Sequence, residues 1–201
     1  GVASNLAGYH MLDKFRETQW GSAQWIETLL LTGNEAIVSE QQKSSALKQM
    51  RATAVILAID TMERSAVWGH VGDSRLYCFR EGRIIMQTRD HSISQTMVDA
   101  GYIKAEEIRN APNRSKLYAA LGNKEQFETE VIPSVFSLKS GDVFLLCSDG
   151  LWEYVIENEM EQLLADAASA VEWVQLLEDK VLAKGHLGQD NYSALVVWCR
   201  D

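Results

Sequence analysis

The sequence predicts one soluble domain of the α+β class, built from antiparallel strands and helices that occur in separate runs. Four short strand-like runs follow one another between residues 52 and 88, with turn residues between them. Helical patterns occupy the first 38 residues and return in residues 157–183. Closely spaced strands favour antiparallel pairing, because parallel strands need long crossover connections. Separate runs of strands and helices therefore predict an antiparallel sheet or sandwich flanked by helices.

The composition is typical of a folded globular chain. Its 201 residues suit one domain with a sizeable core, and 46% of them are hydrophobic. The longest apolar run, Ala54 to Ile59, is too short to span a bilayer, and no signal-peptide pattern opens the chain. The net charge of −9, without a concentrated basic stripe, argues against a nucleic acid or a membrane as the main partner.

The cysteine pattern indicates a reducing compartment. Cys78, Cys147 and Cys199 lie within or at the end of apolar strand patterns, and no CxxC pair occurs. An odd number of cysteines in apolar settings is typical of reduced core thiols, so we expect a cytoplasmic protein. No cluster of Cys and His has the spacing of zinc ligands, and a zinc site is therefore not expected.

The chain begins with two expected helices. Apolar residues recur at helical spacing from Val2 to Phe15, which predicts an amphipathic helix. A second helix is expected over Ala23–Val38, and the polar residues 39–48 are expected to form a loop or the end of that helix. The chain has only two prolines, and no segment has the composition of a domain linker.

Four strands are expected next, with tight turns between them. They cover Ala52–Asp60, Ser65–Val71, Leu76–Arg80 and Arg83–Thr88. Turn residues occupy positions 62–63, 72–74 and 81–82, and these short connections predict an antiparallel meander.

The second half of the chain alternates short helices with isolated strands. Helices are expected at Gln95–Ala100 and Ala105–Asn110, and Pro112 then breaks the helical pattern. The remaining expected elements are a strand near Glu128–Ile132, a buried strand at Val143–Leu146, helices at Glu157–Ala167 and Ser169–Ala183, and a last strand at Tyr192–Cys199.

Two acids at strand ends form the candidate site. Asp149 follows the apolar strand Val143–Leu146, with Gly150 expected to let the chain turn sharply, and Asp190 stands just before the last apolar strand. Two carboxylates at the rims of two buried strands suit a hard cation such as Mg²⁺ or Mn²⁺. The alternative is that each acid is only a turn or cap residue, as is common in Asp-Gly and Asp-Asn pairs.

The order of several motifs resembles a known family. The series is Ala52-Thr53-Ala54-Val55, Gly72-Asp73-Ser74-Arg75-Leu76-Tyr77, Arg89-Asp90-His91-Ser92, Leu121-Gly122, Cys147-Ser148-Asp149-Gly150-Leu151-Trp152 and Asp190-Asn191-Tyr192-Ser193-Ala194. It resembles the PP2C (PPM) family of metal-dependent serine/threonine protein phosphatases, particularly its bacterial branch. A lone Ser-Asp-Gly would carry little weight, whereas the motifs in family order span essentially the whole chain.

The resemblance implies a fold, a reaction and a set of ligands. The family fold is a β-sandwich of two antiparallel sheets with helices outside. Water activated by two or three Mg²⁺ or Mn²⁺ ions attacks a phosphoserine or phosphothreonine of a protein substrate, without a covalent enzyme intermediate. By position, Asp149 and Asp190 match the ligands of the first metal and act in catalysis. Asp90 matches the acid that, with Asp149, holds a third metal. The family also implies a serine/threonine kinase as a partner in the same pathway.

Other motif residues are expected to have structural roles. Asp73 and Arg75 match the family's Gly-Asp-Ser-Arg turn, where an acid and a guanidinium are expected to fix a hairpin. His91 is expected to be a hydrogen-bonded loop histidine. Residues 97–118 match the flap of bacterial members, in which Arg114 or Lys116 offers a contact for a phosphoprotein; a solvated polar face is the favoured interpretation of both.

The chain departs from the family pattern at its beginning. The family has two further strands upstream, which carry a bridging Asp, a second metal-binding acid, a phosphate-binding Arg and a candidate His acid. No Asp-Gly or Glu-Asp pair that could substitute for them precedes position 60 here. A second departure is Arg51-Ala52-Thr53, where the family usually has Gly followed by small hydroxyl residues. We therefore expect residues 1–201 to be a single, N-terminally incomplete phosphatase domain with weak metal binding and turnover on its own. The alternative is a catalytically impaired PP2C-like module that binds phosphoproteins or a signalling partner.

Other functions fit the sequence less well. A cysteine phosphatase that uses Cys147 would need an arginine six positions later, but position 153 is Glu. Ser148 lacks the Gly-x-Ser-x-Gly pattern of a serine hydrolase, and no nucleotide-binding fingerprint occurs. A purely structural domain would explain the strands and helices, but not the order of the motifs.

Overall fold

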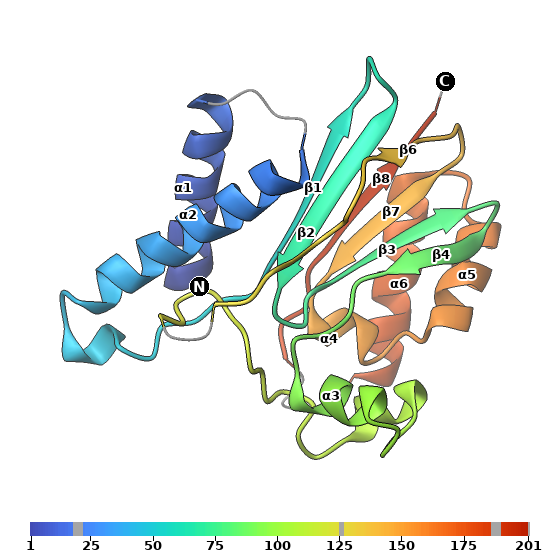
Figure 1. Ribbon diagram of the computed structural model, residues 1–201. Coiled ribbons are helices and arrows are strands. Elements are labelled where there is room, and N and C mark those ends of the chain that lie inside the picture. Colours follow the sequence, from blue (N-terminus) through green and yellow to red (C-terminus); the bar gives the residue numbers. More distant parts are fainter. Residues whose placement is uncertain (18–21, 125–126, 186–189, 201) are drawn as a thin grey trace. The chain divides into compact units, whose positions relative to one another are not determined.

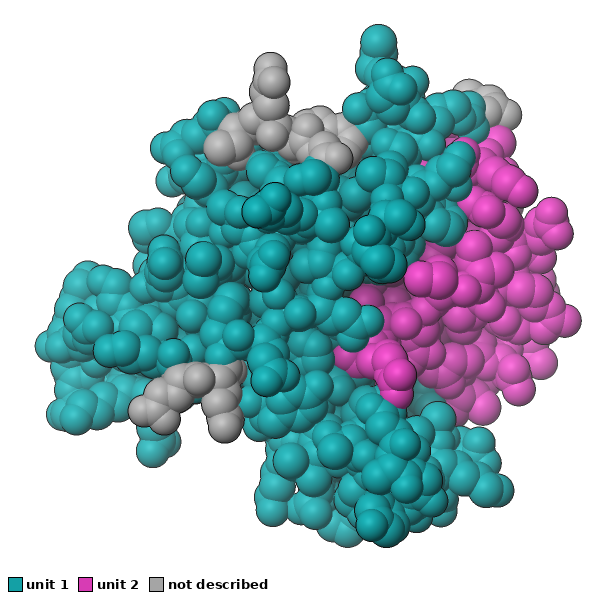
Figure 2. Space-filling view, in the orientation of Figure 1, with its two compact units in different colours: residues 1–73, 90–137 teal, residues 74–89, 138–201 magenta. Residues whose placement is uncertain are grey.

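The computed structural model describes residues 1–17, 22–124, 127–185 and 190–200 (Figure 1). The chain divides into two compact units, which are coloured separately in Figure 2. Unit 1 comprises residues 1–73 and 90–137, and unit 2 comprises residues 74–89 and 138–201. Each unit contains its own antiparallel sheet. That residues 1–201 form a single domain stays a prediction.

Unit 1 begins with a pair of packed helices, α1 (Val2–Glu17) and α2 (Ala23–Gln41). The hydroxyl of Ser22 caps α2 by accepting a hydrogen bond from the backbone N–H of Trp25. The buried face of α2 contacts strand β2 (Ser65–Val71), and the approach is close: a Cβ atom at Gly69 would lie 2.7 Å from the side chain of Ile26. The absence of a side chain at Gly69 therefore lets α2 pack against the sheet.

The sheet of unit 1 is centred on β2. Strand β1 (Ala54–Asp60) pairs with it as an antiparallel hairpin, and the two short strands β5 (Glu130–Val131) and β6 (Phe136–Ser137) also pair with β2 in antiparallel register. The rest of unit 1 contains α3 (Ile93–Asp99) and two 3₁₀ helices, η1 (Ser45–Leu47) and η2 (Ala105–Asn110).

The sheet of unit 2 has the order β4-β3-β7-β8, and all neighbours are antiparallel. Its strands are β3 (Arg75–Arg80), β4 (Arg83–Gln87), β7 (Val143–Cys147) and β8 (Ala194–Trp198). Three helices belong to this unit: α4 (Asp149–Trp152), α5 (Glu157–Asp166) and α6 (Ala170–Lys184). Trp173 of α6 packs edge-on against Phe79 of β3 with 5.0 Å between ring centroids, and both side chains are fully buried. This contact joins α6 to the sheet core.

The structure confirms the expected helices and most of the strands, with shifts of a few residues at the ends. The short helix expected at residues 105–110 is present with the expected bounds, as the 3₁₀ helix η2. Two expectations are wrong. The four strands between residues 52 and 88 do not form one meander, because β2 and β3 belong to different sheets. The last strand is half-buried rather than buried, because β8 stands at the end of the strand order. Within the ranges described above, no helix is long and apolar enough to cross a membrane.

Candidate metal centre

The antiparallel pairing of β7 and β8 brings the segments of Asp149 and Asp190 to the same end of the sheet. Cys147 lies opposite Ala194 in the register, so the C-terminal end of β7 adjoins the N-terminal end of β8. Beyond the strands, the backbone N–H of Ser148 donates to the carbonyl of Ser193 at 3.1 Å, and the N–H of Ser193 donates to the Ser148 hydroxyl at 3.0 Å. These two hydrogen bonds hold the two acidic segments side by side.

Gly150 allows the two segments to approach each other. A Cβ atom at this position would lie 2.9 Å from the carbonyl carbon of Asn191, closer than real side chains come to a backbone. Gly150 lies in the first turn of α4 and is not among the glycines with positive φ. Glycine is therefore not needed here for a left-handed backbone conformation; it is needed because the backbone of Asn191 occupies the space of a side chain.

The two carboxylates have different environments. Asp149 is half-buried at the first position of α4, where its Oδ1 accepts a hydrogen bond from the Gly150 N–H at 2.9 Å. Asp190 is exposed, and its Oδ1 accepts from the Asn191 N–H at 2.7 Å. Burial raises the pKa of Asp149; the hydrogen bond from Gly150 opposes this, and the carboxylates of Asp190 and Glu153 raise the pKa further.

This electrostatic arrangement fits a bound cation. Two carboxylates that repel each other lose that repulsion when a divalent ion lies between them. Their oxygen atoms are also the donors that Mg²⁺ and Mn²⁺ prefer. The donor set and the raised pKa of Asp149 thus agree with the predicted ligand role of Asp149 and Asp190.

Asp90 lies in unit 1, in a loop that is held at several points. Asp90 is buried, with 3% of the residue's surface exposed. The next residue donates its N–H to the carbonyl of Gly72 at 2.9 Å and accepts at its own carbonyl from the N–H of Tyr118 at 3.0 Å. Ser92 then caps α3 by accepting from the N–H of Gln95. The structure thus fixes the backbone around Asp90 within unit 1.

A second group of possible ligands lies in unit 1. One side-chain atom each from His70, His91 and Glu130 falls within a mutual distance of 4.8 Å. The rings of His70 and His91 stack at 4.6 Å, and β2 pairs with β5 so that His70 lies opposite Glu130. The sequence analysis did not identify His70 or Glu130, because their proximity depends on the register of a two-residue strand far along the chain.

The hydrogen bonds of His91 argue against a metal ion in this group. The Gly72 N–H donates to Nδ1 of His91 at 3.3 Å, so the neutral ring carries its proton on Nε2. A metal-bound histidine normally donates from its other ring nitrogen, whereas Nδ1 here accepts. Burial, together with the neighbouring His70, lowers the pKa of His91 to about 4 and keeps it neutral. His91 is therefore a hydrogen-bonded loop histidine, as expected.

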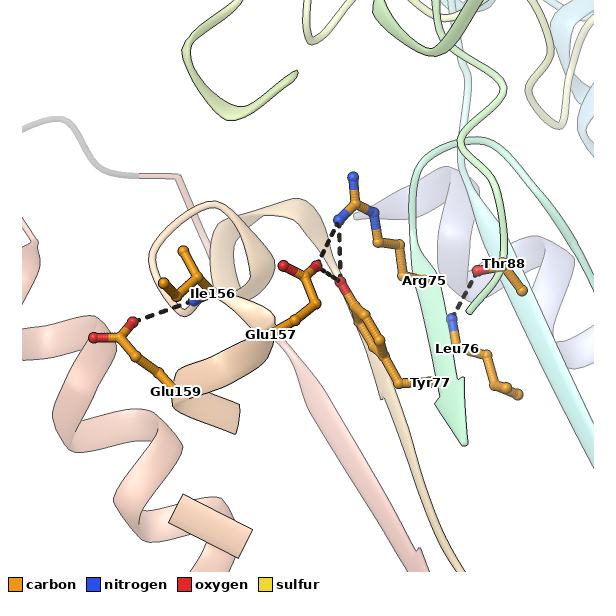
Figure 3. Close-up of polar contacts among 7 residues, drawn as sticks. All are labelled: Arg75, Leu76, Tyr77, Thr88, Ile156, Glu157 and Glu159. Atoms are coloured by element: carbon orange, nitrogen blue, oxygen red, sulfur yellow. Dashed lines mark hydrogen bonds and ion pairs between the residues drawn. The ribbon is translucent and has the colours of Figure 1, made fainter. Parts of the chain in front are cut away.

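Arg75 connects β3 to the helices that follow β7. Its guanidinium lies 3.6 Å from the ring centroid of Trp152, and only 3% of the residue is exposed. Nη1 donates to the Tyr77 hydroxyl at 3.0 Å and lies 3.6 Å from Oε1 of Glu157 (Figure 3). The sequence predicted that Arg75 fixes a hairpin but did not predict these contacts. They link the guanidinium to α4, the helix that begins with Asp149.

The chain has relatives of similar sequence among bacterial phosphatases. It is 30% identical over 203 residues to serine/threonine phosphatase Stp of Listeria monocytogenes serotype 4b, which covers 98% of this chain and 77% of that protein. It is 31% identical over 171 residues to serine/threonine protein phosphatase PstP of Mycobacterium tuberculosis, covering 85% of this chain and 32% of PstP. A comparison with protein-family models gave no match.

Solved structures of bacterial phosphatases match the fold. Phosphatase Stp1 of Staphylococcus aureus superposes with a TM-score of 0.88 at 25% identity, covering 100% of this chain and 78% of Stp1. PstP of M. tuberculosis superposes with a TM-score of 0.83 at 26% identity, covering 99% and 83%. The catalytic domain of PstP in complex with two manganese ions gives a TM-score of 0.79 at 25% identity, covering 97% and 79%. These matches confirm the fold class expected from the sequence.

Proposed function

The chain belongs to the PPM, or PP2C, family of metal-dependent serine/threonine protein phosphatases, which are hydrolases, and on that premise we propose that Asp149 and Asp190 ligate a catalytic metal ion. Asp90 is proposed to ligate a further metal ion, in the role that the family motif implies. The substrate is a phosphorylated protein. We further infer that residues 1–201 act as one phosphatase domain.

One observation carries this proposal. The paired ends of β7 and β8 hold Asp149 and Asp190 on adjoining segments, where burial and then the Asp190 carboxylate raise the pKa of Asp149. The repulsion between two such carboxylates costs free energy when no cation is bound, and a bound cation removes this cost. When bound, Mg²⁺ or Mn²⁺ acidifies water enough to make it a nucleophile near neutral pH, and offsets the charge of the phosphoryl oxygens.

The protein's own residues position these ligands. The Gly150 N–H holds one oxygen of Asp149 at 2.9 Å, which leaves the other oxygen to face a ligand. The Asn191 N–H does the same for Asp190 at 2.7 Å. Arg75 packs on the ring of Trp152 at 3.6 Å and so fixes the short helix α4 on which Asp149 stands. The ligand geometry is thus set before a metal ion arrives.

We propose Mn²⁺ or Mg²⁺ as the cofactor, in two or three ions per domain; the PstP structure with two manganese ions supports Mn²⁺. We also propose a serine/threonine kinase as a partner in the same pathway, because a protein phosphatase needs an enzyme that makes its substrate. A cytoplasmic location is proposed because Cys78, Cys147 and Cys199 are all free thiols.

The test is hydrolysis of a phosphothreonine peptide by the full-length native protein after removal of metal with EDTA. The proposal expects no turnover in EDTA and recovery on addition of Mn²⁺ or Mg²⁺. The alternative, an impaired module that binds phosphoproteins, expects tight peptide binding without turnover at any metal concentration. Turnover that persists in EDTA would contradict the metal-dependent reaction.

A further inference from the structure

His91 forms a reciprocal pair of hydrogen bonds with Gly72. The backbone N–H of His91 donates to the carbonyl of Gly72 at 2.9 Å, and the N–H of Gly72 donates back to Nδ1 of the His91 ring at 3.3 Å. Both polar backbone groups of Gly72 are therefore bonded to one residue. Gly72, His91 and Asp90 all belong to unit 1.

The ring of His91 is held by its neighbours. Only 5% of the residue is exposed. The ring of His70 stacks on it with 4.6 Å between centroids, and the ring of Tyr118 lies at 5.5 Å. Tyr118 also donates its backbone N–H to the carbonyl of His91 at 3.0 Å. These contacts keep the ring in the orientation in which Nδ1 accepts from Gly72.

The bond to Nδ1 restrains a backbone that could otherwise move. Gly72 follows strand β2 and has a φ of +99°, a region that glycine enters without steric cost. Its N–H is buried, so the loss of the ring acceptor would cost free energy. A rearrangement that gives this N–H a new partner would also displace the carbonyl of Gly72, to which the N–H of His91 is bonded.

The same pair of bonds fixes the peptide group that follows Asp90. The N–H of His91 belongs to the peptide group between Asp90 and His91, so its bond to Gly72 sets the orientation of that group. Asp90 is the proposed ligand of a further metal ion, and only 3% of the residue is exposed. A ligand whose backbone is fixed in advance loses less conformational entropy when the ion binds.

We propose that His91 is a positioning residue for Asp90: its ring accepts the Gly72 N–H and thereby holds the backbone from which the Asp90 carboxylate ligates its ion. The inference rests on the proposed function and deepens it, because it adds to the metal centre a residue that acts as a hydrogen-bond acceptor and not as a ligand.

Two variants of similar shape separate the hydrogen bond from the packing. Asparagine and leucine both branch at Cγ, but only asparagine has an oxygen that can replace Nδ1 as the acceptor. In the full-length native protein in EDTA, His91→Leu should speed hydrogen exchange at the Gly72 amide by at least about tenfold, the size of one lost hydrogen bond. His91→Asn should keep this exchange rate within about twofold of wild type.

The metal readout is isothermal titration of Mn²⁺ into the same proteins without substrate. Asp90→Asn identifies the ion whose binding depends on Asp90. His91→Leu should weaken the binding of that ion by about tenfold, and His91→Asn should leave it within about twofold of wild type. The Mn²⁺ concentration for half-maximal hydrolysis of a phosphothreonine peptide should rise in parallel, while kcat at saturating Mn²⁺ stays near the wild-type value.

A double variant shows whether His91 acts through Asp90. Asp90→Asn combined with His91→Leu should bind Mn²⁺ as Asp90→Asn alone does, because the residue to be positioned is then absent. Ser22→Ala is the control for a general loss of stability. It removes the cap of α2, elsewhere in unit 1, and should lower the melting temperature without changing Mn²⁺ affinity.

Three results would overturn the proposal: unchanged Mn²⁺ binding in His91→Leu, equal weakening in the leucine and asparagine variants, or additive effects of Asp90→Asn and His91→Leu. Failure of the proposed function is distinct, because wild type then shows no Mn²⁺-dependent hydrolysis. The titration still decides the role of His91 in that case. Mn²⁺ binding that depends on Asp90, is weakened by leucine and is kept by asparagine supports the role; wild type without such binding overturns it.

Discussion

The backbone of Asn191 lies against Gly150, so that a Cβ atom at position 150 would come within 2.9 Å of the Asn191 carbonyl carbon. This contact joins the segment of Asp149 to the segment of Asp190, since each acid precedes one of the two residues. The distance between the two proposed ligands therefore depends on the missing side chain at position 150.

Gly150→Ala should separate the two acidic segments. The added methyl group forces the Asn191 backbone away, so we expect metal-dependent activity to fall at least about tenfold and stability to fall by about 1–3 kcal/mol, as for other overpacked sites. Gly8→Ala is the control: nothing lies within 4 Å of a Cβ there, and α1 should gain stability. Urea unfolding and phosphopeptide hydrolysis measure the two effects. Full activity in Gly150→Ala would show that the close approach does not matter.

Arg75→Lys should destabilise the protein even though it keeps the positive charge. A lysine cannot lie flat on Trp152 while it also donates to Tyr77. Glu157 would keep its hydrogen bond from the Tyr77 hydroxyl but lose its contact with the guanidinium. We expect a loss of about 2–4 kcal/mol and a matching fall in activity through the displacement of α4.

Arg83→Lys is the matched control for Arg75. Arg83 pairs with Glu161 at 2.6 Å, but its side chain is 76% exposed. Because the Arg83 head is so exposed and a lysine keeps its charge beside Glu161, this change should alter stability by no more than about 0.5 kcal/mol. Chemical denaturation of the two variants side by side makes the comparison. Equal effects of both substitutions would refute a special role of Arg75.

Asp142→Asn should remove an acid-sensitive part of the stability. Asp142 is fully buried and receives two hydrogen bonds of 2.8 Å from the Arg80 guanidinium and a third from the Lys139 N–H. Burial by itself raises the pKa of Asp142, but these hydrogen bonds outweigh it and hold the pKa below its ordinary value of 3.8. The folded state thus favours the charged carboxylate.

The sign of the pH effect follows from this lowered pKa. The contribution of charged Asp142 to the free energy of unfolding is fully present above the unfolded-state pKa of 3.8. It is lost as the pH falls through the lower pKa of the folded state. At pH 6 we expect the free energy of unfolding of wild type to exceed that of Asp142→Asn by about 2 kcal/mol, the size of hydrogen bonds to a charged group. This difference should shrink below about pH 4. Urea titrations at several pH values measure it. A difference that grows on acidification would contradict this account.

Sequence patterns predicted the local elements well because each is determined by nearby residues. The helical spacing of α1 and α2 and the apolar run of β7 were sufficient to place these elements. Asp149 and Asp190 could be named as candidates because each adjoins such a run. Their proximity was not visible in either segment alone; it follows from the pairing of β7 with β8.

The features that the sequence did not predict depend on contacts between distant residues. Turn residues at 72–74 do not reveal that β2 and β3 enter different sheets. Arg75 meets Trp152 and Glu157, which follow it by more than 70 positions. The pairing of His70 with Glu130 depends on a strand of two residues, which is too short to give a period-two pattern.

Isothermal titration of Mn²⁺ into the full-length native protein tests the central claim most directly. Asp149→Asn and Asp190→Asn should each weaken Mn²⁺ binding by at least about tenfold, because each removes a charged ligand. In the presence of EDTA, neither variant should have a lower melting temperature than wild type, because each substitution removes one of two carboxylates that repel each other. Asp179→Asn, at an exposed acid of α6, should bind Mn²⁺ as wild type does. Wild-type Mn²⁺ affinity in both Asp149→Asn and Asp190→Asn would contradict the proposed metal centre.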